Sequence, residues 1–328
     1  MFNFNFMPLS RNSGCKGTKK KRNEKAKIEK SFVFLQPVMK QLSILIPTYN
    51  HNCLPLVSTL QEQASALGAA YEIVVADDGS SLADALSANR TIASLPCCRY
   101  LERGHNTGRA AIRNFLAREA RYDWLLFIDN DMVVSRPDYL RCYAESTCDT
   151  VAYGGYTVDG DARKLRRNLR FRYEQAAAPQ HTAVQRRLKP YQDFHTCNFL
   201  VRRDIMLSIP FDERFHHYGY EDVLFGKQLQ EHGVAICHMD NPLSFQHFES
   251  NASFLAKMEE GLRTLHEFRN ELRGYSRLIR RTESLPATWP LRCFHRLCGP
   301  VLRRWLEHRP ALPLFTLYRL TYFASLSA

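Results

Sequence analysis

Asp129 and Asp131 flank Asn130 between two apolar runs in the segment WLLFIDNDMVV, residues 124–134. Burying one unpaired carboxylate costs free energy, and burying two costs more. Two carboxylates one residue apart can instead share a divalent cation, because Mg²⁺ and Mn²⁺ favour oxygen ligands together with substrate phosphates. A turn capped by an Asp side chain is the simpler alternative, although it needs only one acid. The segment therefore predicts either a metal site or a capped turn at the end of a buried strand.

Two other strand-like runs also end in polar groups. LSILIP (42–47) is followed by Thr-Tyr-Asn at 48–50, and EIVVA leads into Asp-Asp-Gly-Ser at 77–80. Acids at such an end can accept hydrogen bonds from a base or a ribose, but Asp-Gly-Ser is also ordinary turn chemistry, which favours a turn for at least one of the two. If the strands are neighbours in a parallel sheet, the three polar ends meet in the cleft where ligands of open α/β sheets bind.

The stretch NTGRAAIRNF, residues 106–115, predicts the start of a helix. It places Arg109 and Arg113 four residues apart on one helical face. Gly108 would let the backbone come close to a ligand. A solvated basic face is the alternative, and the dinucleotide pattern G-x-G-x-x-G is absent.

Glu221 and Asp222 follow an aromatic and glycine-containing loop and precede apolar residues at helical spacing. This pattern places both acids in the first turn of a helix, where the helix dipole favours their ionised forms. They can be interpreted as helix caps or as a general base held above the cleft.

Alternating strands and helices must position these groups. Continuously apolar strands separated by helices indicate an α/β fold with a mostly parallel sheet covered on both faces. The region 151–250 has shorter apolar pieces, and we interpret it as the second half of the sheet plus long polar loops. The expected strands are 42–47, 71–81, 97–103 and 122–131, and the expected helices are 54–67 and 106–120.

The chain divides into three parts by composition. Residues 1–38 are polar and Lys-rich, which predicts a disordered basic segment. Residues 39–251 would form the catalytic domain, and residues 252–328 a basic helical extension. Within the extension, apolar spacing predicts one long amphipathic helix over 253–281 and a second over 291–306, which Pro300 should kink or split.

The net charge of +12 is concentrated at the two ends, because residues 1–40 and 252–328 are strongly basic and the block between them is mildly acidic. A nucleic-acid enzyme would more often carry its positive face on the catalytic body, so we expect no nucleic-acid partner. Basic C-terminal helices fit either peripheral contact with an anionic membrane or packing on the catalytic domain or a second subunit.

Ten cysteines without a C-x-x-C pair indicate reduced thiols and a cytoplasmic location. If the protein contacts a membrane, we expect the inner face of the cytoplasmic membrane.

Five stretches, taken in order, resemble the inverting family 2 glycosyltransferases with the GT-A fold: SILIPTYN, EIVVADDGSS, NTGRAAIRN, LLFIDNDM and GYED. They cover the chain from about residue 40 to about residue 250. The GYED loop is also similar to that of galactosyl- and N-acetylgalactosaminyl-transferring relatives. The resemblance implies transfer of a sugar from a nucleotide-diphospho-sugar, expected to be a UDP-sugar, to a hydroxyl of a glycan or lipid-linked acceptor in polysaccharide or cell-envelope biosynthesis.

The resemblance also implies roles for individual residues. Asp222 would remove the acceptor proton, and Glu221 would position the acceptor or donor sugar, so that a single displacement inverts the anomeric carbon. Asp129 and Asp131 would hold Mn²⁺ or Mg²⁺ on the diphosphate, with His247 of SFQHFES as a further ligand. The nucleotide-sugar contacts would come from Pro47, Thr48, Tyr49, Asn50, Asp77 or Asp78, Asn106, Gly108, Arg113, Asp129 and Asn130.

Three other functions are compatible with parts of the pattern. A haloacid-dehalogenase-like phosphatase also has a strand ending in D-x-D, but it expects Thr where this chain has Val133. A nucleotidyltransferase would release pyrophosphate from a nucleoside triphosphate. A catalytically inactive sugar-nucleotide-binding module is the third, and the presence of Asp131 and Asp222 argues against it.

Overall fold

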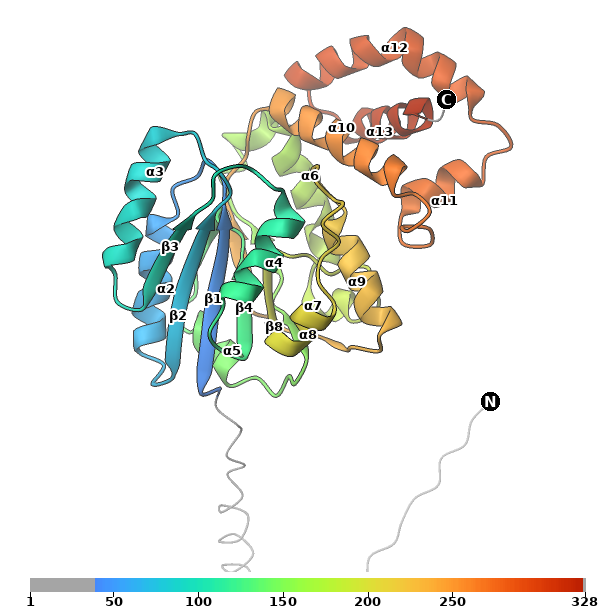
Figure 1. The fold of residues 1–328 in the computed structure, drawn as a ribbon. Helices are drawn as coiled ribbons and strands as arrows, with labels where there is room; N and C mark the ends of the chain where they lie inside the picture. The colour runs from blue at the N-terminus through green and yellow to red at the C-terminus, as the bar shows by residue number, and fades with distance from the viewer. Residues whose placement is uncertain (1–38, 327–328) are drawn as a thin grey trace, which may run out of the picture. The chain divides into compact units, whose positions relative to one another are not determined.

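A seven-stranded sheet organises residues 39–326, which are the part of the chain that the computed structural model describes (Figure 1). The predicted disordered segment 1–38 lies outside the described residues. Neighbouring strands follow the order β3-β2-β1-β4-β8-β6-β9. Their bounds are β1 (Gln41–Thr48), β2 (Ala70–Asp77), β3 (Cys98–Glu102), β4 (Trp124–Ile128), β6 (Val151–Tyr153), β8 (Asn198–Arg202) and β9 (Ile236–His238).

The first four strands are parallel, as the sequence predicts. β2 and β3 lie on one side of β1, and β4 lies on the other, so the strand order reverses between β1 and β4. The carboxyl ends of β1 and β4 therefore meet at a switch point, the place where open α/β sheets bind ligands. Thr48 ends β1, and Asp129 follows the last residue of β4 at this edge.

β8 runs antiparallel to both of its neighbours, β4 and β6, so the sheet is mixed rather than parallel throughout. Its register pairs Ile128 with Asn198, which places the start of β8 beside the end of β4. The aromatic rings of Phe127 and Phe199 stack across this pair with centroids 4.9 Å apart. The segment that precedes β8 consequently reaches the same edge as the acids that follow β4.

A second, three-stranded sheet begins directly after Asp131. It has the order β5-β10-β7, with β5 (Met132–Val133), β7 (Tyr156–Val158) and β10 (Leu243–Phe245). The Asp129 N–H donates to the Cys197 carbonyl at 3.1 Å, and the Met132 N–H donates to the Asp129 carbonyl at 3.2 Å. The first bond ties the acidic loop to the residue that precedes β8, and the second closes the loop on itself before β5 begins.

Helices cover the large sheet and bury its apolar side chains. α2 packs on β2, whereas α4 packs on β1 and β2 and lies in front of the sheet in Figure 1. The core residues of these two helices include Val57, Leu60, Ile112 and Leu116. The helix bounds are α2 (Leu54–Ser65), α3 (Ala83–Arg90), α4 (Arg109–Glu119), α5 (Tyr139–Ala144), α6 (Leu169–Ala177), α7 (Ala183–Arg186), α8 (Arg203–Ser208) and α9 (Glu221–Glu231).

Four helices form the C-terminal part: α10 (Asn251–Glu267), α11 (Arg277–Glu283), α12 (Trp289–His308) and α13 (Leu312–Leu326). The predicted single helix over 253–281 is wrong, because α10 ends at Glu267 and α11 starts anew. Gly274 has a φ of +86°, and the Ser276 hydroxyl caps α11 by accepting from the Leu278 N–H at 3.2 Å. The apolar spacing continues through the break because Phe268 and Leu272 in the connection are buried.

α12 is continuous, so of the two outcomes predicted at Pro300 the split does not occur, and the kink stays a prediction. Packing against α13 and α10 offsets the backbone hydrogen bond that a proline nitrogen cannot donate. A second apolar cluster joins these helices to α6 and consists of Leu169, Phe254, Leu255, Leu306, Phe315 and Tyr318. Across residues 39–326, no helix has the length and apolar character needed to cross a membrane.

Candidate active site

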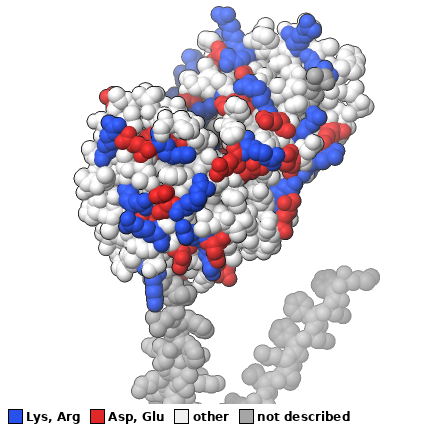
Figure 2. Space-filling model, in the orientation of Figure 1, with Lys and Arg blue, Asp and Glu red and all other residues white. Residues whose placement is uncertain are grey.

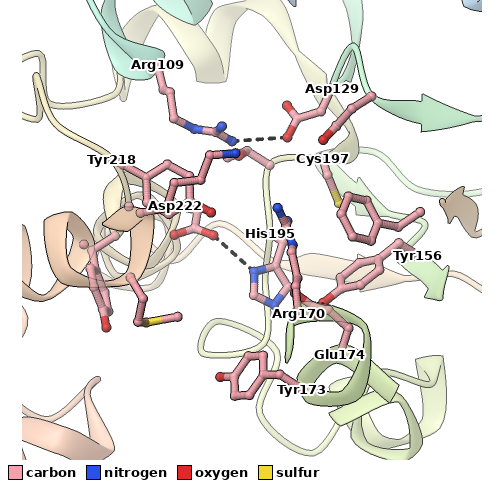
Figure 3. A pocket seen from close by; sticks show the side chains of 18 of the residues that line it. Arg109, Asp129, Tyr156, Arg170, Tyr173, Glu174, His195, Cys197, Tyr218 and Asp222 are labelled. Atoms are coloured by element: carbon pink, nitrogen blue, oxygen red, sulfur yellow. Dashed lines mark hydrogen bonds and ion pairs between the residues drawn. The ribbon is translucent and has the colours of Figure 1, made fainter. Parts of the chain in front are cut away.

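Two cavities adjoin at the switch point of the sheet. The first, here called the strand-end cavity, has a volume of about 390 Å³ and lies over the carboxyl ends of β1 and β4. The second, the helix-lined cavity, has a volume of about 380 Å³ and is walled by α6, α9, α10 and α13 (Figure 3). Five residues line both cavities, and they are Arg109, Asp129, Asp131, Tyr218 and Lys257. These residues therefore mark the junction at which a molecule in one cavity can reach a molecule in the other.

Most residues with a predicted nucleotide-sugar contact line the strand-end cavity. They come from the ends of β1 and β4, from the turn after β2 and from the start of α4. The nine are Pro47, Thr48, Tyr49, Asp78, Asn106, Gly108, Arg113, Asp129 and Asn130. Asn130 donates from Nδ2 to Thr48 Oγ1 at 2.8 Å, which ties the two strand ends together.

The sequence allows two interpretations of Asp77 and Asp78, a turn or a contact with the nucleotide, and the structure places one residue in each position. Asp77 accepts from the Ser80 N–H at 2.7 Å and from the Tyr100 hydroxyl at 2.8 Å, so it holds the turn and is not among the lining residues. Asp78 borders the cavity and accepts from the N–H groups of Thr107 and Gly108, each at 3.0 Å. The structure thus brings Asp78, and not Asp77, to the cavity wall.

Asn50 also holds two loops together and does not line the strand-end cavity. Its φ is +50°, and its Oδ1 accepts from the N–H groups of Ser81 at 2.7 Å and Leu82 at 3.0 Å. The loop after β1 is therefore fastened to the loop after β2.

Gly108 precedes α4 in a conformation that suits glycine. Its φ is +91°, and a Cβ at this position would lie 3.1 Å from the carbonyl oxygen of His216. The close approach of the 215–216 backbone to α4 therefore depends on the missing side chain.

A network of four charges, of which Arg113 and Glu221 are buried, lies at the junction of the cavities. Arg113, with 1% of its side chain exposed, donates from Nη2 to Asp129 Oδ1 at 2.6 Å. Arg109 donates from Nη2 to Asp129 Oδ2 at 3.2 Å and from Nε to Glu221 Oε1 at 2.6 Å. Both carboxylate oxygens of Asp129 are thus bound by arginines. Arg113 is not part of a solvated basic face, which rules out that alternative for this residue.

Asp131 differs from Asp129 because its carboxylate forms no hydrogen bond or ion pair with any residue in the range 39–326. Burial raises the pKa of Asp131, and the charge of Asp129 raises it further. Within the same range, no group of three or more His, Cys, Asp or Glu side chains is arranged to hold a metal ion. A partnerless carboxylate at a cavity junction fits a divalent cation that takes its remaining ligands from bound phosphate oxygens.

His247 is exposed, in the loop after β10. Its ring lies edge-on to that of His51, with centroids 6.1 Å apart. Burial lowers the pKa of His51, while the charge of Asp131 raises it and that of His247 lowers it. The three side chains are therefore near one another, and a role for His247 as a metal ligand stays a prediction.

Asp222 and His195 form a pair in the helix-lined cavity (Figure 3). His195 Nδ1 lies 3.1 Å from Asp222 Oδ2, and the Val223 N–H donates to Asp222 Oδ1 at 2.8 Å. Burial disfavours the charged form of both side chains, but the contact between them favours the charged forms more strongly. The pKa of Asp222 is lowered by the hydrogen bond and charge of His195, and the pKa of His195 is raised by those of Asp222. Two positive φ angles, +94° at Gly219 and +69° at Tyr220, turn the chain into α9 at this point.

Aromatic rings and hydrogen-bonding side chains make up the rest of this cavity. The Tyr156 hydroxyl donates to Glu174 Oε2 at 3.1 Å, and burial raises the pKa of Glu174. Arg170 donates from Nη1 to both carboxylate oxygens of Glu249, at 2.8 and 2.9 Å. Such a wall can pack against the apolar faces of a sugar ring and bond its hydroxyls.

Comparison with known proteins gives a match to glycosyl transferase family 2 over residues 43–209, just over half of the chain. The chain belongs to this family. The match covers both acid-bearing strand ends and the segment that contains His195.

Similar proteins extend the likeness beyond this segment. The glycosyltransferase is 24% identical over 246 residues to a chondroitin synthase from Escherichia coli, an alignment that takes in 64% of this chain but only 35% of that protein. Its structure resembles the mannosyltransferase PcManGT from Pyrobaculum calidifontis in complex with GDP-Man and Mn²⁺, with a TM-score of 0.52, 14% identity, and coverage of 93% of this chain and 92% of that one. TarS from S. aureus in complex with UDP-GlcNAc gives a TM-score of 0.48, 16% identity, and coverage of 88% and 91%. The predicted GT-A fold is confirmed, whereas the finer likeness of the GYED loop stays a prediction.

Several lining residues of the glycosyltransferase were not predicted from sequence, among them His195, Glu174 and Arg170. His195 lies three residues before β8, and no sequence pattern marks it, because its place at the cavity depends on the direction of that strand. Glu174 and Arg170 lie on α6, a helix that the sequence interpretation left among the loops of 151–250.

Proposed function

We propose that this glycosyltransferase moves a sugar from a nucleotide-diphospho-sugar, preferentially a UDP-sugar, to a hydroxyl of a glycan or lipid-linked acceptor by a single inverting displacement. The observation that carries the proposal is the arrangement of Asp131 and Asp222. Both line the helix-lined cavity, and Asp131 also lines the strand-end cavity. The donor would occupy the strand-end cavity with its sugar at the junction, and the acceptor would enter from the helix-lined side.

The residues at the junction suit a diphosphate group. Arg109 borders both cavities and provides positive charge beside the position proposed for the phosphates. Asp131 would hold Mn²⁺ or Mg²⁺, and Asp129 and His247 remain proposed as further ligands. When bound, such an ion supplies Lewis-acid stabilisation for the negative charge that grows on the leaving diphosphate. The Mn²⁺ that accompanies GDP-Man in the mannosyltransferase with the same fold supports a divalent ion.

Asp222 would accept the proton of the attacking hydroxyl. His195 holds one carboxylate oxygen of Asp222, and the Val223 N–H holds the other, so the carboxylate has a fixed orientation toward the cavity. The acceptor oxygen forms its bond to the anomeric carbon as the bond to the phosphate oxygen breaks on the opposite face. Glu221 would act through its contact with Arg109, which it holds in place at 2.6 Å.

The proposed partners are the nucleotide-sugar donor and a glycan or lipid-linked acceptor, without a nucleic acid. The relative that is named a chondroitin synthase supports a glycan acceptor. A lipid-linked acceptor would bring the enzyme to a membrane surface, and the C-terminal part, 252–328, would make that contact. The division into a basic segment 1–38, a catalytic domain 39–251 and this extension also stays a proposal.

Calorimetry with UDP and Mn²⁺, followed by assays of nucleoside-diphosphate release over a panel of nucleotide sugars, tests the proposal. Asp131→Ala should lose metal-dependent nucleotide binding. Asp222→Asn should keep that binding and lose transfer by a factor of about 10² to 10⁴, the usual contribution of a general base. Asp84→Asn, which changes an exposed acid on α3, is the matched control and should alter neither. Equal UDP affinity in wild type and Asp131→Ala would overturn the metal assignment, and full transfer by Asp222→Asn would overturn the base.

A further inference from the structure

α12 turns its apolar side outward. The exposed fractions of Trp289, Leu297 and Val301 are 65%, 77% and 69%, and Phe294 and Trp305 are exposed as well. Residues 289, 297, 301 and 305 are spaced by multiples of four, so their side chains form one stripe along the helix. We call these five residues the α12 stripe.

The opposite side of α12 packs against the protein through both apolar and polar contacts: Leu302 and Leu306 join the apolar cluster shared with α6, α10 and α13. Only Gly299 and Leu306 are fully buried in this helix of 20 residues. His295 Nδ1 lies 3.2 Å from the Thr321 hydroxyl of α13, and Arg303 donates from Nε to Glu259 of α10 at 2.8 Å. The helix therefore already has an apolar contact with the protein, and a helix that served only to complete the fold would not expose five more large apolar side chains, so the α12 stripe indicates a partner.

Positive charge accompanies the stripe. Arg292, Arg296 and Arg304 form no ion pair or side-chain hydrogen bond with any residue of the described range 39–326. Figure 2 shows Lys and Arg side chains among uncharged surface, with some Asp and Glu side chains, over the C-terminal helices. Long basic side chains can lie along an apolar surface and keep their charge in water, which is the composition of helices that lie in a bilayer interface.

We propose that α12 docks on an anionic lipid bilayer, with the α12 stripe at the level of the headgroups and the arginines against lipid phosphates. The contact is peripheral, because it uses one face of the helix along its length of about 30 Å. Charge complementarity favours this occupant over a second copy of the chain. Two copies meeting at this face would bring the same unpaired arginines together, and like charges across an interface oppose association.

The contact would place the helix-lined cavity close to the membrane. α12 packs on α10 and α13, and these two helices contribute Lys257, Met258 and Arg319 to the cavity wall. The docking of α12 specifies the membrane contact proposed above. It rests on the proposed function in one respect only, namely that a position near the membrane would help the enzyme reach a lipid-linked acceptor. Binding to vesicles is measured without donor or acceptor, so its failure and the failure of the transfer proposal are separate results.

Flotation of the full chain with vesicles tests the docking directly. We expect binding to phosphatidylcholine vesicles that contain phosphatidylglycerol, weak binding to phosphatidylcholine alone, and release by high salt. Arg296→Gln and Arg304→Gln should each weaken binding by about fivefold. Replacing Leu297, Val301 and Trp305 with Ser should weaken binding by at least about tenfold. The matched controls are Arg166→Gln, Val184→Ser and Leu188→Ser, which change exposed residues outside α12 and should leave binding unchanged.

Tryptophan fluorescence of the unaltered protein provides a second test that needs no variant. Vesicles with brominated acyl chains should quench Trp289 and Trp305, which are exposed, and should leave the half-buried Trp124 of β4 unquenched. Absence of flotation and quenching would overturn the proposal. Two other results would overturn it. The first is that the stripe variants keep vesicle binding. The second is that, in sedimentation without lipid, the unaltered protein is a dimer and the stripe variants are monomers.

Discussion

His195 Nδ1 lies 3.1 Å from Asp222 Oδ2, so the residue proposed as the general base is one half of an ion pair. A third of the His195 side chain, 33%, is open to the cavity. The charged and titratable groups around the imidazole come from several elements, and they are Asp222, Glu174, Asp193, His181 and His238. The acids raise the pKa of His195 against the effect of burial, and this direction has two measurable consequences.

The first consequence concerns stability. The folded pKa of His195 is raised above 6.5 and that of Asp222 is lowered below 3.8. The pair therefore stabilises the fold fully between these two ordinary values, and its contribution is lost as pH rises through the folded pKa of His195 or falls through that of Asp222. His195→Gln should reduce Tm more at about pH 5.5 than at about pH 8.5. Thermal denaturation against pH checks this, and a pH-independent difference in Tm would contradict it.

The second consequence concerns the rate. A carboxylate paired with imidazolium is a weaker base than one beside neutral imidazole, so transfer by the wild type should rise as pH passes upward through the raised pKa of His195. His195→Gln can still hold Asp222 but cannot titrate, so this rise should be absent from its profile of kcat against pH. If the variant keeps the same rise, another group is responsible for it.

The network at the cavity junction predicts unequal losses of stability for its two arginines. Arg113→Met removes a charge that is almost fully buried and leaves Asp129 and Glu221 with one arginine between them, which should lower the free energy of unfolding by about 3–5 kcal/mol. Arg109→Met should cost less, because 41% of the Arg109 side chain is exposed. Urea denaturation of both variants checks the order, and equal losses would contradict the assignment of Arg113 as the buried member.

Replacing Asp131 should have the opposite effect on the free energy of unfolding. Its carboxylate is half-buried and has no partner among residues 39–326, so Asp131→Asn should raise the free energy of unfolding by about 1 kcal/mol in the absence of metal, as often happens at functional sites. The same change should abolish any rise in Tm caused by Mn²⁺ with UDP. Asp129→Asn is the control: it removes a carboxylate that two arginines bind, and it should destabilise the protein.

Gly108 and Gly68 form a matched pair for the loop before α4. Both have positive φ, +91° and +70°, but only a Cβ on Gly108 would meet the His216 carbonyl, whereas nothing lies within 4 Å of one on Gly68. Gly68→Ala should cost about 1 kcal/mol from backbone strain alone. Gly108→Ala should cost more and should weaken nucleotide binding, because the cavity wall must shift. Chemical denaturation and calorimetry with UDP separate the two effects.

The parallel half of the fold could be predicted because its strands are apolar runs that end in polar residues. Once β1 and β4 are neighbours, the ends of both strands must lie at one edge, and this places Thr48 beside Asn130 and brings Asp129 and Asp131 to the cleft. The helix that starts at Glu221 followed from its apolar spacing.

His195 could not be found in this way. The sequence argument considered the carboxyl ends of parallel strands, and His195 precedes an antiparallel strand. β8 starts where β4 ends, with Asn198 opposite Ile128, and sequence patterns do not reveal strand direction. The same limit applies to the predicted helix over 253–281, since apolar spacing persists through a turn whose residues also face the core.

The order in which the chain lines the two cavities has a consequence for engineering. Before residue 132 the chain contributes most of the strand-end cavity, and after it the chain contributes most of the helix-lined cavity. A chimera that exchanges the segment from β5 onward with that of a family member should therefore inherit a new choice of recipient molecule and keep its original choice of activated sugar. The two specificities of this enzyme would then be separable by a single splice point.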